Sequence, residues 1–468
     1  MAMTTIHRIA TAAIIAGLMM PAIDAAGQQT ESLKVPTFGT VTIYRGSVPP
    51  QQVVLFVSGD GGWNLGVVGM AEQLRDAGAL VVGIDIRPFM KALNSSSRCA
   101  YPAGDFEELS RAIQMRFKLP AYKRPILVGY SSGATLVYAA IAAAPPETFA
   151  GAVSLGFCPD IELTKPLCHM RGLTATKRPK SVGYDLSVFP GSTVPWMVLQ
   201  GDVDQVCDAN ATRAFVAATG AARLFWLPKV GHGFGVNARW VPQFLEAYRA
   251  IAASQRAREV PRTTTPAVAD LSLVEVPASG RAGGDKLAVL LTGDGGWAEI
   301  DKRLAAGFAA AGVPVVGWSS LEYYWTPRTP DGAAADLARI IDHFTTTWQK
   351  DRVLVVGYSF GADVASFLVN RLPPRAKAHV AQVALLGASD TAAFEFHLDS
   401  WLGGGADPRH PTIPEIERLS VPVTCVSAAD ETDSVCRVVK GAHIRPLSIG
   451  EGHHFGGEYD RLVGEILK

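Results

Sequence analysis

The sequence predicts two tandem α/β domains, each a mostly parallel sheet with helices on both faces. Four motifs occur twice in the same order along the chain, which indicates a duplication. Within each copy, short apolar strands alternate with helical segments, and this alternation favours a parallel sheet. Glycine-rich loops follow several strands, and the carboxyl ends of parallel strands are where ligand sites form.

The two copies of the motifs lie roughly 230 residues apart, which is the length of a domain and not of a solenoid repeat. The matching residues are 53–63 with 287–297, 126–134 with 354–362, 206–207 with 435–436, and 231–235 with 452–456. We therefore expect one domain over residues 30–256 and a second over residues 269–468. A Pro/Thr-rich stretch at residues 257–268 is the expected linker.

Strands and helices are expected at matching places in the two copies. Apolar runs that end in glycine or a turn residue predict strands, and longer amphipathic stretches predict helices. In the first copy we expect strands at residues 53–57, 80–84 and 125–128 and helices at 67–77, 106–117 and 134–144. In the second copy we expect strands at 287–291, 313–317 and 353–356 and helices at 304–311, 333–348 and 362–370.

The first 26 residues have the pattern of a secretion signal. His7 and Arg8 precede an apolar run at residues 9–22, and Ala25 and Ala26 offer a cleavage site. The run is shorter than the ~20 residues that cross a bilayer. We therefore expect an exported, soluble periplasmic protein without a transmembrane anchor.

Composition argues against some partners. Hydrophobic residues make up 48 % of the chain, enough for large cores, and 43 basic residues balance 43 acidic ones. Because no basic excess attracts phosphate backbones, we expect no nucleic-acid partner. No Cys/His cluster has zinc spacing, so we expect no metal and no cofactor.

Six cysteines in an exported protein permit disulfides. Four lie in the first half and two in the second, so each half can pair internally. Reduced, buried thiols are the alternative. The expected pairs, in order of preference, are Cys425–Cys436, Cys158–Cys168 and, by elimination, Cys99–Cys207.

Ser131 and Ser359 each lie in a Gly-x-Ser-x-Gly motif between an apolar strand and a helix. This context is the nucleophile elbow of the α/β-hydrolase fold. The serine oxygen then lies at a helix N-terminus, whose dipole favours developing negative charge. The sequence therefore predicts a serine nucleophile in each half.

An acid should follow each serine in chain order. Asp204 and Asp430 each come shortly after a predicted strand, and these are the expected acids. Asp202 and Asp433 are the alternatives.

A histidine should come last. His232 and His453 each follow a glycine after an apolar segment, and His454 is the alternative in the second half. The expected catalytic triad is Ser359, Asp430 and His453, with a second triad of Ser131, Asp204 and His232.

The roles follow from triad chemistry. Ser359 attacks a carbonyl, His453 transfers the proton, and Asp430 orients the imidazole. Two backbone N–H groups should form the oxyanion hole, and we expect them from Phe360 and Asp294.

Asp294, Trp297 and Arg328 are the expected substrate-binding residues. A carboxylate beside an oxyanion hole repels the developing charge unless it faces away or meets a cation. Our hypothesis is that Asp294 binds a substrate ammonium, and the alternative is that it binds N–H groups of its own loop. Arg328 follows an aromatic stretch at residues 323–325 and could hold a phosphate, with the aromatic rings holding an acyl chain. A packed loop is the alternative.

Three motifs together resemble a known family. They are Gly-Asp-Gly-Gly-Trp at 293–297, Gly-Tyr-Ser-x-Gly at 357–361 and Gly-His-His-Phe-Gly at 452–456. They are similar to motifs of the AcvB/VirJ family of virulence-associated bacterial periplasmic proteins, and the resemblance covers essentially the whole mature chain. It implies hydrolysis of the aminoacyl ester of aminoacyl-phosphatidylglycerol (lysyl or alanyl) at the membrane surface, by Ser359, Asp430 and His453.

The competing hypothesis is a non-catalytic periplasmic protein that escorts secreted proteins or docks on a type IV secretion system, which the resemblance also implies. Fold alone does not decide between these functions. An escort protein would not need an intact triad. A general secreted esterase or lipase is a third hypothesis.

Overall fold

The computed structural model describes residues 29–95, 99–145, 147–168, 172–257, 265–279, 284–395, 410–432 and 434–468. The predicted signal peptide and residues 258–264 of the predicted linker lie outside this set. We refer to residues 29–257 as the N-terminal half and to residues 265–468 as the C-terminal half.

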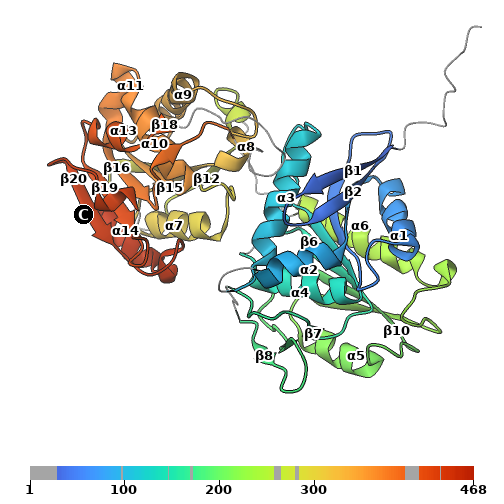
Figure 1. Cartoon of the computed structure of the whole chain (residues 1–468). Helices are drawn as coiled ribbons and strands as arrows, with labels where there is room; N and C mark the ends of the chain where they lie inside the picture. The colour runs from blue at the N-terminus through green and yellow to red at the C-terminus, as the bar shows by residue number, and fades with distance from the viewer. Residues whose placement is uncertain are drawn as a thin grey trace, which may run out of the picture.

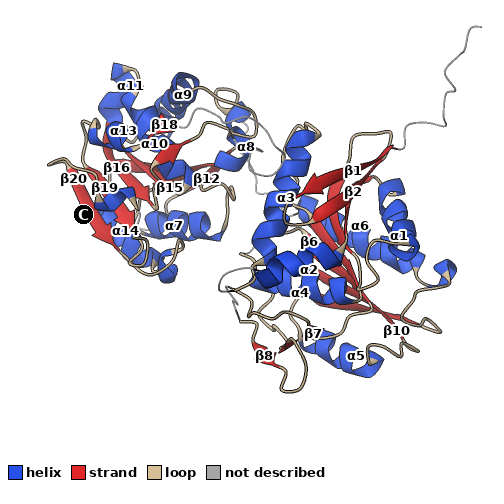
Figure 2. Ribbon diagram, viewed as in Figure 1, coloured by secondary structure: helices blue, strands red, loops and turns tan. Residues whose placement is uncertain are grey.

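The N-terminal half is built on an eight-stranded sheet (Figures 1 and 2). Two strands at one edge, β1 and β2, run antiparallel to their neighbours, and the remaining strands are parallel. The spatial order is β1 (Gln29–Val35), β2 (Gly39–Arg45), β4 (Ala79–Ile84), β3 (Gln52–Val57), β5 (Ile126–Tyr130), β6 (Gly151–Leu155), β10 (Trp196–Gly201) and β11 (Ala222–Leu227).

The C-terminal half repeats this order in a seven-stranded sheet. Its edge strand β12 is antiparallel to β14, and the other pairs are parallel. The spatial order is β12 (Leu273–Val276), β14 (Val315–Trp318), β13 (Lys286–Leu291), β15 (Arg352–Tyr358), β16 (Val380–Leu386), β19 (Val423–Ser427) and β20 (Ile444–Ser448).

Helices cover both faces of each sheet. In the N-terminal half, α1 (Leu65–Asp76) and α6 (Val241–Ala257) pack on one face, and α2 (Ile86–Ser95), α3 (Pro102–Arg116), α4 (Ser132–Ala143) and α5 (Ala209–Ala218) pack on the other. In the C-terminal half, α7 (Glu299–Ala310) and α14 (Tyr459–Leu467) pack opposite α8 (Ser320–Tyr323), α9 (Pro330–Trp348), α10 (Phe360–Asn370), α11 (Pro374–His379) and α13 (Ile413–Glu417).

Short elements complete the described fold. The N-terminal half carries a three-stranded sheet of β7 (Asp160–Ile161), β9 (Tyr184–Leu186) and β8 (Ala175–Lys177), and β17 (Thr391–Ala392) pairs with β18 (His410–Pro411) in the other half. The 3-10 helices are η1 (Asn237–Arg239), η2 (Ala269–Leu271), η3 (Val435–Arg437) and η4 (Phe455–Gly457).

Strand β3 shows why the central strands are apolar along their whole length. All of its residues are buried. Val53, Leu55 and Val57 enter the core on one face of the sheet, and Val54 and Phe56 enter the core on the other. Side chains alternate along a strand, so a sheet covered on both faces needs apolar residues at every position. The predicted α/β fold with mostly parallel sheets is confirmed.

Three disulfides link the six cysteines, and the predicted pairing is right for one of them. Cys425–Cys436 is present, whereas Cys158–Cys168 and Cys99–Cys207 are wrong: the pairs are Cys99–Cys168 and Cys158–Cys207. Cys158 and Cys207 follow β6 and β10, which are neighbours in the sheet. The backbone N–H of Cys168 donates to the carbonyl of Ala100, beside Cys99. Three disulfides are typical of proteins from oxidising compartments.

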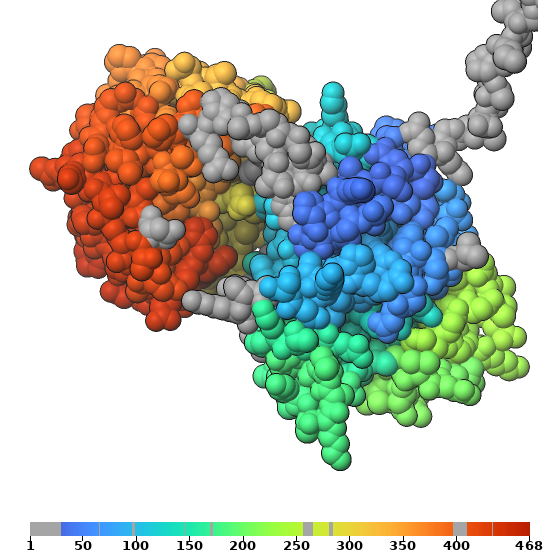
Figure 3. Space-filling model, in the orientation of Figure 1, coloured from blue at the N-terminus to red at the C-terminus, as the bar shows by residue number. Residues whose placement is uncertain are grey.

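The two halves touch along one side of each, as the space-filling view shows (Figure 3). Trp325 donates its indole N–H to the carbonyl oxygen of Leu119 at 2.7 Å, and Lys302 forms an ion pair with Glu147. Within the described residues, the helices are too short or too polar to span a bilayer.

Asp301 is a buried acid in the first turn of α7. Its side chain accepts a hydrogen bond from the backbone N–H of Ala298 at 3.2 Å, and the residue is 1 % exposed. Burial raises the pKa of Asp301 to about 8. In the N-terminal half, the residue four places after the matching tryptophan is the apolar Val67.

We expect Asp301→Asn to flatten the pH dependence of the unfolding free energy. The folded chain keeps this proton up to about pH 8, whereas the unfolded chain loses it near pH 3.8, the ordinary pKa of an aspartate. The free energy of unfolding therefore falls as pH rises through that window. One proton gives a slope of about 1.4 kcal/mol per pH unit. Denaturant unfolding of the wild type and of Asp301→Asn at several pH values measures the two slopes. Glu299→Gln, on the same helix, is the control. Equal slopes for wild type and Asp301→Asn would contradict the assignment.

Candidate active sites

Each half carries a serine on a sharp turn between a strand and a helix. Ser359, between β15 and α10, has φ 52° and ψ −120°, and Ser131, between β5 and α4, has φ 56° and ψ −124°. A positive φ is strained for a residue other than glycine and is concentrated at functional sites. Both turns lie at carboxyl ends of parallel strands, as the nucleophile elbow requires.

Flanking glycines are needed because backbones meet at these turns. A Cβ on Gly361 would lie 2.3 Å from the carbonyl oxygen of Leu291, and a Cβ on Gly357 would lie 2.4 Å from the carbonyl oxygen of Gly361. In the other half, a Cβ on Gly133 would lie 2.4 Å from the carbonyl oxygen of Val57. Any side chain at these positions would push the helix away from the sheet.

In the C-terminal half, Ser359, His453 and a carboxylate form a hydrogen-bonded chain. Nε2 of His453 lies 2.8 Å from Oγ of Ser359, and Nδ1 lies 2.8 Å from Oε1 of Glu431. The predicted acid, Asp430, is wrong, because its carboxylate instead accepts a hydrogen bond from the backbone N–H of Gly452 at 2.7 Å. Glu431 occupies the position of the acid.

Strand register explains this correction. Val426 and Leu199 are equivalent, because each carbonyl accepts a hydrogen bond from the glycine after the neighbouring strand, at 2.9 and 3.1 Å. Five residues after these positions stand Glu431 in the C-terminal half and Asp204 in the N-terminal half. Aligning Asp430 with Asp204, as the sequence suggests, shifts the two halves by one residue relative to each other. The alternative acid Asp433 lies outside the described residues.

Hydrogen bonds hold Glu431 in place. Its second oxygen accepts from the backbone N–H of Ala428 at 3.0 Å, and its carbonyl accepts from Nε of Arg437 at 2.8 Å. The side chain of Glu431 is 21 % exposed and that of His453 is 46 % exposed. The hydrogen-bonded triad is therefore most accessible to solvent at the histidine.

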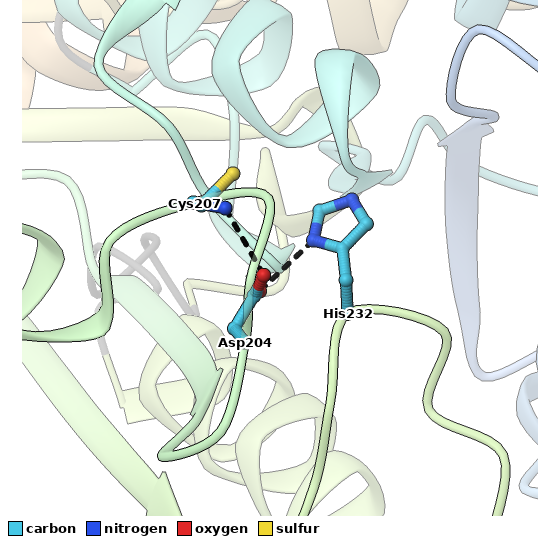
Figure 4. Close-up of side chains that lie close together, drawn as sticks. All are labelled: Asp204, Cys207 and His232. Atoms are coloured by element: carbon cyan, nitrogen blue, oxygen red, sulfur yellow. Dashed lines mark hydrogen bonds and ion pairs between the residues drawn. The ribbon is translucent and has the colours of Figure 1, made fainter.

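The N-terminal half brings together its three predicted residues. Nε2 of His232 lies 2.9 Å from Oγ of Ser131, and Nδ1 lies 2.9 Å from Oδ2 of Asp204. Figure 4 shows the His232 ring and the Cys207 N–H converging on Asp204, which also accepts from the N–H of Val206. Burial would raise the pKa of Asp204, but hydrogen bonds from His232 and the backbone outweigh it and hold the pKa below its usual value.

Asp204, Cys207 and His232 also place three atoms of metal-ligand type within 4.8 Å of one another. The Cys207 sulfur is bonded to Cys158, so it offers no thiolate. The other two groups contact each other as an acid–histidine pair, and such a set lacks the ligands of a zinc site. The alternative acid Asp202 lies two residues before Asp204, where its side chain accepts a hydrogen bond from the backbone N–H of Lys229 at 2.6 Å.

A glycine lies against each histidine ring, and the motif search missed both. A Cβ on Gly387 (φ 65°) would lie 2.9 Å from the His453 ring, and a Cβ on Gly156 (φ 63°) would lie 3.1 Å from the His232 ring. Glycine permits the positive φ and the close approach together. A matching Leu-Gly pair after β6 and β16 is the sequence signal that could have found them.

The Gly293–Trp297 loop packs beside the nucleophile. A Cβ on Gly293 would lie 3.6 Å from Cβ of Ser359. Trp297 anchors the loop on β14, since a Cβ on Gly317 would lie 2.1 Å from the indole ring. The predicted substrate residue Trp297 therefore fixes the loop and also lines the adjoining cleft.

A cleft of about 190 Å³ lies between the halves at Ser359. The C-terminal half contributes Asp294, Trp297, Ser359, His453 and His454 to its lining. The N-terminal half contributes charged side chains, namely Glu107, Arg111, Arg124 and Glu147. The alternative histidine, His454, thus lies at the cleft, but His453 is the residue that contacts Ser359.

Asp294 meets a cation that sequence inspection did not identify. A guanidinium nitrogen of Arg111, on α3 of the other half, donates to Oδ2 of Asp294 at 2.6 Å. Desolvation in the cleft would raise the pKa of Asp294, but the charge and hydrogen bond of Arg111 outweigh it and hold the pKa below its usual value. In the structure, Arg111 takes the place that we expected a substrate ammonium to fill. No motif marks Arg111, since the pairing depends on how the halves meet.

The aromatic stretch near Arg328 is a packed loop. Tyr323, Tyr324 and Trp325 are buried, and Trp325 bonds to Leu119 of the other half. The Arg328 guanidinium lies 4.5 Å from the centre of the Tyr323 ring and donates to that residue's carbonyl at 3.2 Å. Arg328 is not among the described residues that line the cleft, and a phosphate site at Arg328 stays a prediction.

The fold and the two Ser–His–carboxylate chains define an α/β-hydrolase-fold protein with a serine-hydrolase arrangement in each half. The chain belongs to the VirJ family, described as bacterial virulence proteins, whose sequence profile matches residues 51–155 and 285–468. No curated protein sequence matches the chain.

Solved structures resemble this chain over about half of its length. The esterase domain of a Rhodothermus marinus protein is 13 % identical with a TM-score of 0.33, covering 49 % of this chain and 98 % of that one. A dienelactone hydrolase from Anabaena variabilis is 16 % identical with a TM-score of 0.33, covering 47 % and 96 %. A lidless α/β serine hydrolase from Xanthomonas campestris is 19 % identical with a TM-score of 0.31, covering 51 % and 99 %.

Glu431→Gln and Asp430→Asn test the acid assignment. In a chain carrying Ser131→Ala, we expect Glu431→Gln to lower kcat for p-nitrophenyl acetate by about a thousandfold, because the imidazole loses the carboxylate that orients it. Asp430→Asn should cost less than about tenfold, since the asparagine amide oxygen can still accept the hydrogen bond from the Gly452 N–H. Steady-state kinetics measure both. A larger loss for Asp430→Asn would restore the aspartate as the acid.

Proposed function

We propose that the chain is a periplasmic serine esterase that removes the aminoacyl group, lysyl or alanyl, from aminoacyl-phosphatidylglycerol. The reaction is assigned to the C-terminal half. The hydrogen-bonded chain from Ser359 through His453 to Glu431, at the edge of a cleft, carries this proposal. The family resemblance supports the choice of substrate.

The side chains have the roles of a serine-hydrolase triad. Oγ of Ser359 attacks the ester carbonyl while Nε2 of His453 accepts its proton. Glu431 holds the Nδ1–H and stabilises the imidazolium. His453 then protonates the departing alcohol of the lipid, leaving an acyl-enzyme on Ser359. Water, activated by the same imidazole, releases the amino acid.

Backbone N–H groups would stabilise the tetrahedral intermediate. Phe360 begins α10 directly after the nucleophile, and Asp294 lies in the loop packed against Ser359. We assign the N–H groups of these two residues to the oxyanion hole.

The charges of the cleft suit an aminoacyl phospholipid. Carboxylates of Glu107, Asp294 and Glu147 line it together with guanidinium groups of Arg111 and Arg124. In the structure Arg111 pairs with Glu107 and Asp294, and Arg124 pairs with Glu147. A headgroup that carries both an ammonium and a phosphate would meet side chains of either sign at these pairs.

A wider groove of about 600 Å³ adjoins the cleft and shares His453 with it. It gives the glycerol and the beginning of the acyl chains an apolar place beside the scissile ester. Its apolar lining includes Tyr101, Ala143, Pro145, Ile300 and Tyr459.

We expect aminoacyl-phosphatidylglycerol to accumulate in cells whose only copy of the protein carries Ser359→Ala, and not in cells with Ser131→Ala. The reason is that only the Ser359 turn adjoins the charged cleft described above. Extracted lipids are separated and quantified by mass spectrometry, with immunoblots of the periplasmic fraction to show equal amounts of protein.

The same experiment separates the enzyme from an escort protein. An escort for secreted proteins or a docking protein of a secretion system needs no serine chemistry, so Ser359→Ala would leave the lipids unchanged. Unchanged lipids in the Ser359→Ala cells would contradict the proposed hydrolysis. Accumulation with Ser131→Ala alone would move the activity to the N-terminal half.

A further inference from the structure

Arg111 connects carboxylates from the two halves. Its side chain lies on α3 and is 17 % exposed. One guanidinium nitrogen donates to Oδ2 of Asp294 at 2.6 Å, and another donates to Oε1 of Glu107, one turn earlier on α3, at 2.5 Å. Glu107 therefore holds the guanidinium in the direction of the other half.

The loop that Arg111 reaches is the one beside the nucleophile. Gly293 packs against Ser359, and Asp294 is the next residue. In the proposed mechanism, the Asp294 N–H faces the negative charge that develops on the substrate oxygen. A carboxylate on the same residue opposes that charge unless a cation balances it.

We propose that Arg111 is a positioning residue of the Ser359 site: its guanidinium cancels the Asp294 carboxylate and fixes the loop that presents the Asp294 N–H to the oxyanion. The N-terminal half thereby completes the active site of the C-terminal half. This inference rests on the proposed esterase function of Ser359.

The N-terminal copy of the loop lacks this pairing. Asp60 has the place of Asp294, and in the described part of the chain no ion pair involves it. The nearby Arg87 pairs with Asp85 instead, at 2.6 Å. The charge balance is therefore particular to the Ser359 site.

Arg111 must be distinguished from a contact that merely joins the halves. Lys302 and Glu147 form a second ion pair between the halves, and it does not involve Asp294. Lys302→Gln is thus a matched control, because it removes an ion pair between the halves and leaves the loop carboxylate balanced.

The test uses the full mature chain with Ser131→Ala, so that only Ser359 turns over p-nitrophenyl acetate. We expect Arg111→Gln to lower kcat at least about tenfold with KM within about twofold, because only the transition state carries the opposed charge. Adding Asp294→Asn should restore kcat to within about threefold of Asp294→Asn alone. Arg111→Lys, which keeps the charge, should retain most of the activity, and Lys302→Gln should stay within about twofold of the parent.

Thermal unfolding of each variant shows whether the halves remain folded. If Arg111→Gln matches the parent, or if the double variant stays as slow as Arg111→Gln, the positioning role is overturned while the esterase remains. If Ser359→Ala leaves turnover unchanged in this chain, the proposed function and this inference are overturned together.

Discussion

The C-terminal site depends on three backbone segments that meet around Ser359 so closely that the flanking positions 357 and 361 have no room for a side chain. Strand β15 brings the chain to the turn, α10 leaves it, and β13 passes beside it closely enough that Gly361 faces the carbonyl of Leu291. The strained φ of the serine is tolerated because packing on both sides determines it. The same contact brings the next loop, Gly293–Trp297, against the nucleophile. One steric constraint therefore places both the attacking oxygen and the groups assigned to stabilise the oxyanion.

Much of this frame was predictable from the sequence because its causes are local. Apolar strands buried on both faces give continuous runs, and the strands and helices expected at matching places in the two copies are present with shifted ends. The serines and histidines were found because glycine must flank them. The acid was missed because its place is set by strand register: Asp430 and Glu431 are adjacent, and only the sheet shows which one faces His453. The Cys158–Cys207 disulfide was missed for the same kind of reason, since β6 and β10 are neighbours in space but not in sequence.

The two halves share a frame and differ in what surrounds it. The turn that carries Asp204 is tied to the neighbouring strand end by Cys158–Cys207. In the C-terminal half, Ser389 has the place of Cys158, and the matching Cys436 bonds to Cys425 inside β19. Both disulfides secure the segment that follows the acid, by different routes. A side-chain constraint can thus change partners while the backbone around the triad stays the same.

The contact between the halves gives the duplication a physical meaning beyond two copies of one fold. A carboxylate in the loop beside the nucleophile is costly when a negative charge forms there, unless a cation compensates it. In the C-terminal half this compensation comes from a residue of the other half, and Glu107 holds that residue in place. The Arg111 side chain is 17 % exposed and the Asp294 side chain 53 % exposed, so the pair meets where the cleft opens to solvent. The position of α3 relative to β13 therefore determines the net charge beside Ser359. Although each half has its own core, both halves contribute residues to this one site.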